Sequence, residues 1–137
     1  MKILRFVPAI CIFLLIATGI YLSNSGQGSL LVGYVKSLPY GDKLGHFILF
    51  GGLAFSLNFA LRLRCFCLYI VPIPIGSFAV LSFAILEELT QLYIPSRSFD
   101  LLDIYSDVAG VTLFTILNYL PRMIKAIIHK EIDSLSD

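Results

Sequence analysis

Four apolar stretches, each close to the length that a helix needs to cross a membrane, dominate this sequence. They cover about residues 4–22, 44–61, 67–89 and 100–120. The hydrocarbon core of a bilayer is ~30 Å thick, which corresponds to about 20 residues of α-helix. Only 14% of the 137 residues are charged, whereas soluble domains average about 25%. We therefore expect an all-α fold: one integral membrane domain, a bundle of four transmembrane helices.

The ends of these stretches carry local signals. Lys2 and Arg5 give the first stretch the basic start of a signal peptide. The Tyr-Leu-Ser-Asn-Ser segment that follows lacks a small-x-small cleavage pattern, which favours a retained anchor. The next residues, Ser23–Ser29, have the composition of a flexible loop.

Prolines interrupt the third stretch and bound the fourth. A proline inside a helix loses a backbone hydrogen bond and clashes with the preceding turn. Pro72 and Pro74 therefore predict a third helix that is kinked, or that begins regularly only after Pro74. The fourth helix is predicted to take Ser98 as its N-cap and to end before Pro121, which leaves residues 121–137 as a tail.

The distribution of positive charge predicts the orientation. Lys and Arg are enriched in the cytoplasmic segments of membrane proteins. With both termini cytoplasmic, seven of these residues are inside and only Lys36, Lys43 and Arg97 are outside. The loop between the third and fourth stretches is then extracytoplasmic.

Two polar blocks are predicted to meet at this outer face. The first is Asp42-Lys43-x-x-His46, and the second runs from Glu88 to Asp107. Ionisable residues this close to a bilayer are costly, so they indicate a functional site by default. Glu88, Asp103 and His46 are the acid–base candidates. The candidate ligand-binding residues are Asp42, Lys43, Gln91, Arg97, Asp100 and Asp107. Glu87 is expected to face lipid head groups or solvent, because it falls outside the Glu-x-x-Gln pattern.

The charges of these blocks point to two kinds of ligand. Arg97 precedes the start of the fourth helix, where a guanidinium and free amides favour an anion. The neighbouring carboxylates favour the opposite charge, and a divalent cation bridging carboxylates and a phosphate would reconcile the two. Asp107 lies about two turns, or roughly 10 Å, deeper than Asp100. At that depth it needs a partner: Lys43, Arg97, His46, a cation or a proton.

The ordered combination of these residues resembles the VanZ-like family of small bacterial membrane proteins. The resemblance covers roughly residues 38–117 and rests on Asp42-Lys43-x-x-His46, Glu88-x-x-Gln91, the Pro95–Asp103 segment and Gly110. It implies a multi-pass protein of the bacterial cytoplasmic membrane, associated with low-level teicoplanin resistance, and it supplies no reaction mechanism. Many members have Asn where this chain has Asp107, so the charge of the site differs.

Three classes of function fit these observations. The first is a protein that recognises or modifies an anionic envelope lipid or a lipid-linked cell-wall precursor. The second is a non-catalytic scaffold or immunity-type protein whose polar blocks lock helices together. The third is an ion or proton transporter that uses the carboxylates as a relay. A net charge of +1 argues against nucleic-acid binding. Small faces at Gly45, Gly51 and Gly52 make a homodimer a candidate assembly.

Overall fold

The computed structural model describes residues 3–25, 33, 38–95 and 97–136. The chain forms a 3₁₀ turn, η1 (Ile3–Phe6), then α1 (Val7–Asn24), α3 (Gly41–Ala60), β1 (Cys65–Leu68), β2 (Val71–Pro74), α4 (Ile75–Gln91) and α5 (Leu101–Ser136). Residues 26–29 of the predicted loop lie outside the described residues, as does Lys36.

Membrane-spanning length is found in three helices of the described part of the chain. Ile3–Asn24, Gly41–Ala60 and Leu101–Asp133 are each long and apolar enough to cross a bilayer, which supports the first, second and fourth predicted spans. The helix α4 has 17 residues, about 25 Å at 1.5 Å per residue. It is therefore at the lower limit for a spanning helix.

The third predicted span is wrong in its first part. Residues 67–68 and 71–74 belong to the two strands, with a turn at residues 69–70 between them. The strands pair antiparallel with Cys65 opposite Pro74 and Leu68 opposite Val71. Pro72 and Pro74 explain the difference, since neither can donate the hydrogen bond that a helix requires. Of the two predicted alternatives, a helix that begins only after Pro74 is confirmed. The fold is mostly helical, and the small sheet corrects the all-α prediction.

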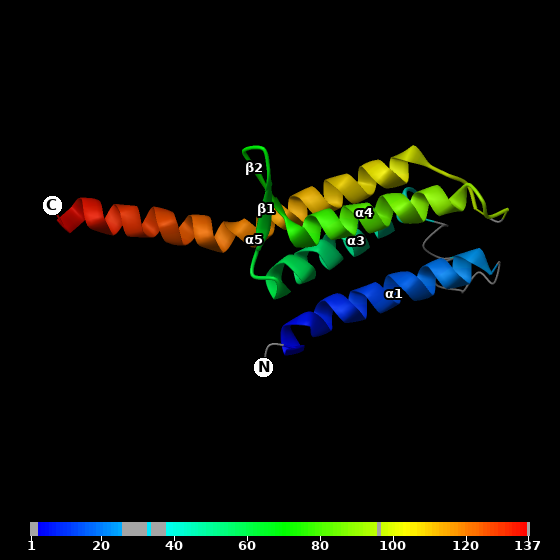
Figure 1. Cartoon of the computed structure of the whole chain (residues 1–137), viewed down its shortest axis with the longest axis horizontal. Helices are drawn as coiled ribbons and strands as arrows, with labels where there is room; N and C mark the ends of the chain where they lie inside the picture. Colours follow the sequence, from blue (N-terminus) through cyan, green and yellow to red (C-terminus); the bar gives the residue numbers. More distant parts are fainter. Residues whose placement is uncertain (1–2, 26–32, 34–37, 96, 137) are drawn as a thin grey trace.

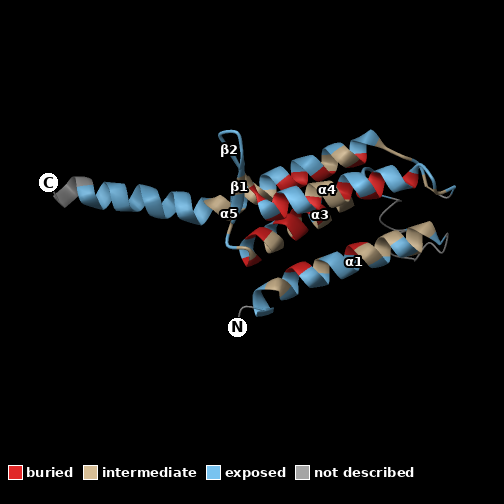
Figure 2. Cartoon of the chain, in the orientation of Figure 1, coloured by how far each residue is buried: buried red, intermediate tan, exposed pale blue. Residues whose placement is uncertain are grey.

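The helices α3, α4 and α5 form the body of the molecule (Figure 1), and α1 packs on α3. The buried residues lie on the faces that these helices turn towards one another (Figure 2). The core comprises Ala9, Ile16, Phe50, Leu53, Ala54, Val80, Ala84 and Val111. α3 and α5 start at the same end of the bundle and run parallel, while α4 runs back between the hairpin and the loop before α5.

The parallel helices α3 and α5 approach closely at two glycines. A Cβ on Gly110 would overlap the backbone carbonyl of Phe47, and a Cβ on Gly51 would come within 3.0 Å of the Gly110 backbone. The helix that approaches Gly110 closely is therefore α3. A Cβ on Gly52 would touch Ile12 of α1 at 3.7 Å. Gly51 and Gly52 therefore make helix contacts within the chain. Of the three glycines of the predicted dimer face, only Gly45 has open space beside it.

A buried polar cluster joins three helices in the half of the bundle nearer the hairpin. Asn58 is fully buried, and its Nδ2 donates to Ser77 Oγ (2.7 Å) and Thr115 Oγ1 (3.4 Å). Asn58 Oδ1 accepts from the Ser77 backbone N–H at 3.2 Å. These uncharged groups satisfy one another, so they fix α3, α4 and α5 in register without a net charge.

The last helix does not end before Pro121, contrary to the prediction. α5 contains Pro121 and continues to Ser136. An interior proline removes one backbone hydrogen bond and clashes with the preceding turn, but in α5 the helix continues on both sides of Pro121. Residues 122–133 extend beyond the bundle and are exposed (Figure 2). It includes apolar side chains on successive turns, Ile124, Ile127 and Ile128 among them.

Candidate functional site

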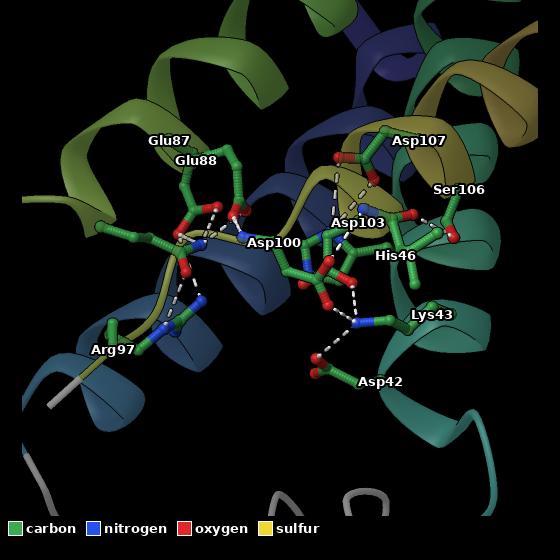
Figure 3. A network of polar contacts seen from close by, with 12 residues as sticks. Asp42, Lys43, His46, Glu87, Glu88, Arg97, Asp100, Asp103, Ser106 and Asp107 are labelled. Carbon is green, nitrogen blue, oxygen red and sulfur yellow. Dashed lines mark hydrogen bonds and ion pairs between the residues drawn. The ribbon is translucent and has the colours of Figure 1, made fainter.

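The two polar blocks come together where α3 and α5 begin and α4 ends (Figure 3). Lys43, in the first turn of α3, lies at the centre of one group of carboxylates. Its Nζ is 2.5 Å from Asp100 Oδ2, 2.6 Å from Asp103 Oδ1 and 3.8 Å from Asp42 Oδ2. One ammonium group therefore faces three carboxylates from two helices.

His46 lies one turn deeper in α3 and faces two carboxylates of α5. Its Nδ1 is 3.1 Å from Asp107 Oδ1, and its Nε2 is 3.8 Å from Asp103 Oδ2. The imidazole ring also stacks on Phe50, with 5.6 Å between the ring centres. Because only 2% of the Asp107 side chain is exposed, His46 is the partner that the predicted depth of Asp107 required.

A second group of polar side chains surrounds the end of α4. Gln91 Nε2 donates to Glu87 Oε2 at 3.0 Å and to Glu88 Oε2 at 2.9 Å. Arg97 Nε donates to Gln91 Oε1 at 3.3 Å, and Arg97 Nη2 is 3.6 Å from Glu87 Oε1. The acidic partner of Arg97 is therefore Glu87.

Glu87 itself corrects a prediction. It is 7% exposed rather than facing head groups or solvent. The pattern Glu-x-x-Gln assigned Gln91 to Glu88 alone, but Gln91 is also one full turn from Glu87 and bonds to both. Glu87 belongs to the site, and its i,i+4 spacing to Gln91 is the signal that could have found it.

Asp100 connects the two groups. Its backbone N–H donates to Glu88 Oε1 at 2.6 Å, and its own Oδ1 accepts from the Leu102 N–H at 2.9 Å. Asp100, rather than the predicted Ser98, therefore caps α5. The hydrogen bond from Lys43 holds the pKa of the Asp100 carboxyl below its usual range. The folded protein thus favours the ionised form of Asp100, which stabilises the fold at neutral pH. This stabilisation is lost as the pH falls through the lowered pKa of Asp100.

The site as a whole is acidic. Among the described residues, six carboxyl groups lie close to two basic side chains, those of Lys43 and Arg97. The carboxyl groups belong to Asp42, Glu87, Glu88, Asp100, Asp103 and Asp107. Glu88, Asp103 and Asp107 are each at most 4% exposed. Burying uncompensated charge is costly, so the excess must be balanced by protons, by a bound cation or by a cationic ligand.

The arrangement offers groups for proton transfer and for metal binding. Among the described residues, Asp42, His46 and Asp103 have ligand atoms that all lie within 4.8 Å of one another. All nine predicted site residues lie in this region, in two groups joined by Asp100. Ser96, in the connecting segment, lies outside the described residues. No known family model, curated protein or solved structure was found to match this chain.

Proposed function

We propose that this chain is a VanZ-like protein of the bacterial cytoplasmic membrane, with four spans, both termini cytoplasmic and the polar site facing outwards. The course of the chain supports a fourth crossing. α3 and α5 both have spanning length and both begin at the polar site, so α4 has to return the chain from one side of the bilayer to the other. The positive charges supply the orientation.

The polar site, in this proposal, recognises or modifies the anionic head group of an envelope lipid or lipid-linked cell-wall precursor. The observation that carries it is the burial of Glu88, Asp103 and Asp107 at one end of a bundle whose outer surface is apolar. Such groups are rare and costly in membrane proteins and usually mark a functional site. In the proposed topology, lipid head groups would lie beside this end of the bundle.

The cationic and the acidic residues of the site would have different roles. Arg97 and Lys43 supply the cations that an anionic group needs, with Gln91 as a hydrogen-bond donor. Asp42, Asp100 and Asp107 hold these donors and His46 in place. If a bond is made or broken, Glu88, Asp103 and His46 are the groups for general acid–base catalysis. The resemblance to VanZ-like proteins suggests altered teicoplanin tolerance as the phenotype.

Native mass spectrometry of protein gently extracted from its own membrane tests the proposal. Arg97→Gln combined with Glu87→Gln removes the cation and its acidic partner together, so the bundle keeps a neutral, hydrogen-bonding pair. We expect a phosphate-bearing lipid on the wild type and its loss in the double variant. Arg122→Gln is the control, because Arg122 contacts the Arg62 carbonyl far from the site. Equal lipid on all three proteins, or none on the wild type, would overturn the proposal.

A scaffold is the second candidate function. It is favoured by Lys43 of α3, which forms ion pairs with Asp100, just before α5, and with Asp103 of α5, and so links the two helices. It predicts that Arg97→Ala alone lowers the folded yield and that adding Glu87→Ala restores it together with full biological function. A restored fold without the phenotype would exclude the scaffold.

Proton transport has less support in the geometry. Between Asp107 and the hairpin end of the bundle, the buried residues Phe50, Ala54 and Val111 are apolar. The next polar cluster in that direction, at Asn58, is uncharged. A proton relay would have to cross this layer. Proteoliposomes with a pH-sensitive dye would detect it as a flux difference between the wild type and Asp107→Asn.

A further inference from the structure

We infer that the polar site binds one divalent metal ion between His46 Nε2 and the carboxylates of Asp42 and Asp103. This inference rests on the proposed function in placing a lipid phosphate beside the same residues, where the ion would offer it a free coordination position. The protein's own side chains form the metal site, so the ion is expected to bind without any lipid.

The distances suit a shared ion. Imidazole nitrogen and carboxylate oxygen lie ~2.0–2.2 Å from a bound Zn²⁺, which places two ligands of one ion about 3–4 Å apart. His46 Nε2 and Asp103 Oδ2 are 3.8 Å apart, and neither is hydrogen-bonded to the other. Asp42 completes a set in which all ligand atoms lie within 4.8 Å. Asp42 is at the helix start with 44% of its side chain exposed, so it can move the small distance to an ion.

His46 is held in the orientation of a metal ligand. Its Nδ1 lies against Asp107 at 3.1 Å. A proton on Nδ1 that Asp107 accepts leaves the lone pair on Nε2, which points towards Asp103. Histidines that bind metals usually have this second carboxylate behind them, and it fixes the tautomer and the ring direction. Asp107 is therefore a positioning residue for the ion.

Asp103 supplies an independent observation. It is 4% exposed, and its Oδ1 makes no hydrogen bond of regular geometry among the described residues. Its closest cation is Lys43 Nζ at 2.6 Å, which also faces Asp100 and Asp42. Oδ1 of this buried carboxylate therefore lies against Lys43, while Oδ2 lies 3.8 Å from His46 Nε2 and is the oxygen that an ion would take.

The donor set indicates the kind of ion. One imidazole with two carboxylates suits Mn²⁺ or Zn²⁺ better than Ca²⁺ or Mg²⁺, which favour oxygen ligands alone. Lys43 competes with the ion for Asp42 and Asp103. Its removal should therefore tighten metal binding, whereas removal of a simple structural ion pair would have no such effect.

Mn²⁺ titration followed by electron paramagnetic resonance tests the inference. The protein is placed in nanodiscs of phosphatidylcholine, which carries no net charge and adds little Mn²⁺ binding of its own. We expect one Mn²⁺ per wild-type chain, displaced by Zn²⁺. Binding should be at least tenfold weaker in His46→Gln and tighter in Lys43→Met. The control, His129→Gln, changes an exposed histidine in the tail and should bind as the wild type does.

A spin-echo measurement on the wild type keeps the test independent of how the variants fold. Nitrogen modulation from a directly bound imidazole is expected on the Mn²⁺ signal. Absent nitrogen coupling, wild-type binding no greater than in empty nanodiscs, or unchanged binding in folded His46→Gln would each overturn the inference. The Mn²⁺ titration and the lipid recovery together separate the two proposals. A wild type that yields lipid but binds no Mn²⁺ defeats only the ion, and one that binds Mn²⁺ but yields no lipid defeats only the lipid.

Discussion

Asp107 and His46 show how a single pair of side chains makes a deep carboxylate acceptable. The aspartate is two turns into α5, where water is scarce, and the imidazole one turn into α3 is the group that reaches it. The sequence spacing predicted this depth and gave His46 as one of several partners. The choice among them depends on the rotation of α3 against α5, which no local pattern contains.

Substitution of Asp107 should separate its charge from its hydrogen bond. Asp107→Ala leaves the buried Nδ1 of His46 without its acceptor, so we expect a loss of about 1–3 kcal/mol in the free energy of unfolding. Asp107→Asn retains an oxygen acceptor and should unfold close to the wild-type temperature. Thermal unfolding in detergent, followed by circular dichroism, measures both. Equal destabilisation by the two variants would show that the charge, and not the hydrogen bond, stabilises the pair.

The packing of α3 against α5 depends on a backbone contact that is too close for any side chain larger than that of glycine. At Gly110 the backbone of α5 lies against the Phe47 carbonyl of α3, and this approach brings Asp103 and Asp107 within reach of Lys43 and His46. Glycine at this position therefore determines the geometry of the site without touching a ligand.

Gly110→Ala should destabilise the protein, while Gly45→Ala should not. The added Cβ at position 110 meets backbone, which cannot rotate away, so overpacking is expected to cost about 1–3 kcal/mol or more. A Cβ at Gly45 meets nothing within 4 Å, and alanine is favoured over glycine in a helix by about 0.5–1 kcal/mol. The folded fraction after detergent extraction and heating compares them. A Gly110→Ala variant as stable as Gly45→Ala would contradict the close helix contact.

At this scale the sequence predicted helices well where apolar length and charge determine them, as in α1 and α3. It failed where two structures compete for one segment. Residues 67–74 are as apolar as a membrane-spanning helix. Pro72 and Pro74 cannot donate helical hydrogen bonds, however, and the segment forms a hairpin with residues 65–66. The Asn58 cluster was not predicted either, since isolated Asn, Ser and Thr residues on three helices have no common spacing along the chain.

The whole molecule has two chemically different ends. Carboxylates gather at the start of α3 and α5, whereas Arg62, Arg64 and Arg122 lie by the hairpin. In Figure 1, α1 begins and α5 ends on the hairpin side of the bundle. Four crossings with the hairpin side cytoplasmic then satisfy both the path of the chain and the preference of Lys and Arg for the inside.

Cysteine labelling in intact cells tests this orientation with two matched tyrosines. Tyr93, beside the polar site, is 87% exposed, and Tyr69, at the hairpin turn, is 95% exposed. Each is replaced by cysteine in a background where Cys11, Cys65 and Cys67 are serine. A membrane-impermeant maleimide should label Tyr93→Cys in intact spheroplasts and Tyr69→Cys only after lysis, because the bilayer separates the two ends. The reverse pattern would place the acidic site inside the cell, where a receptor for an outer-leaflet lipid could not operate. Labelling of both before lysis would mean that α4 does not cross the membrane.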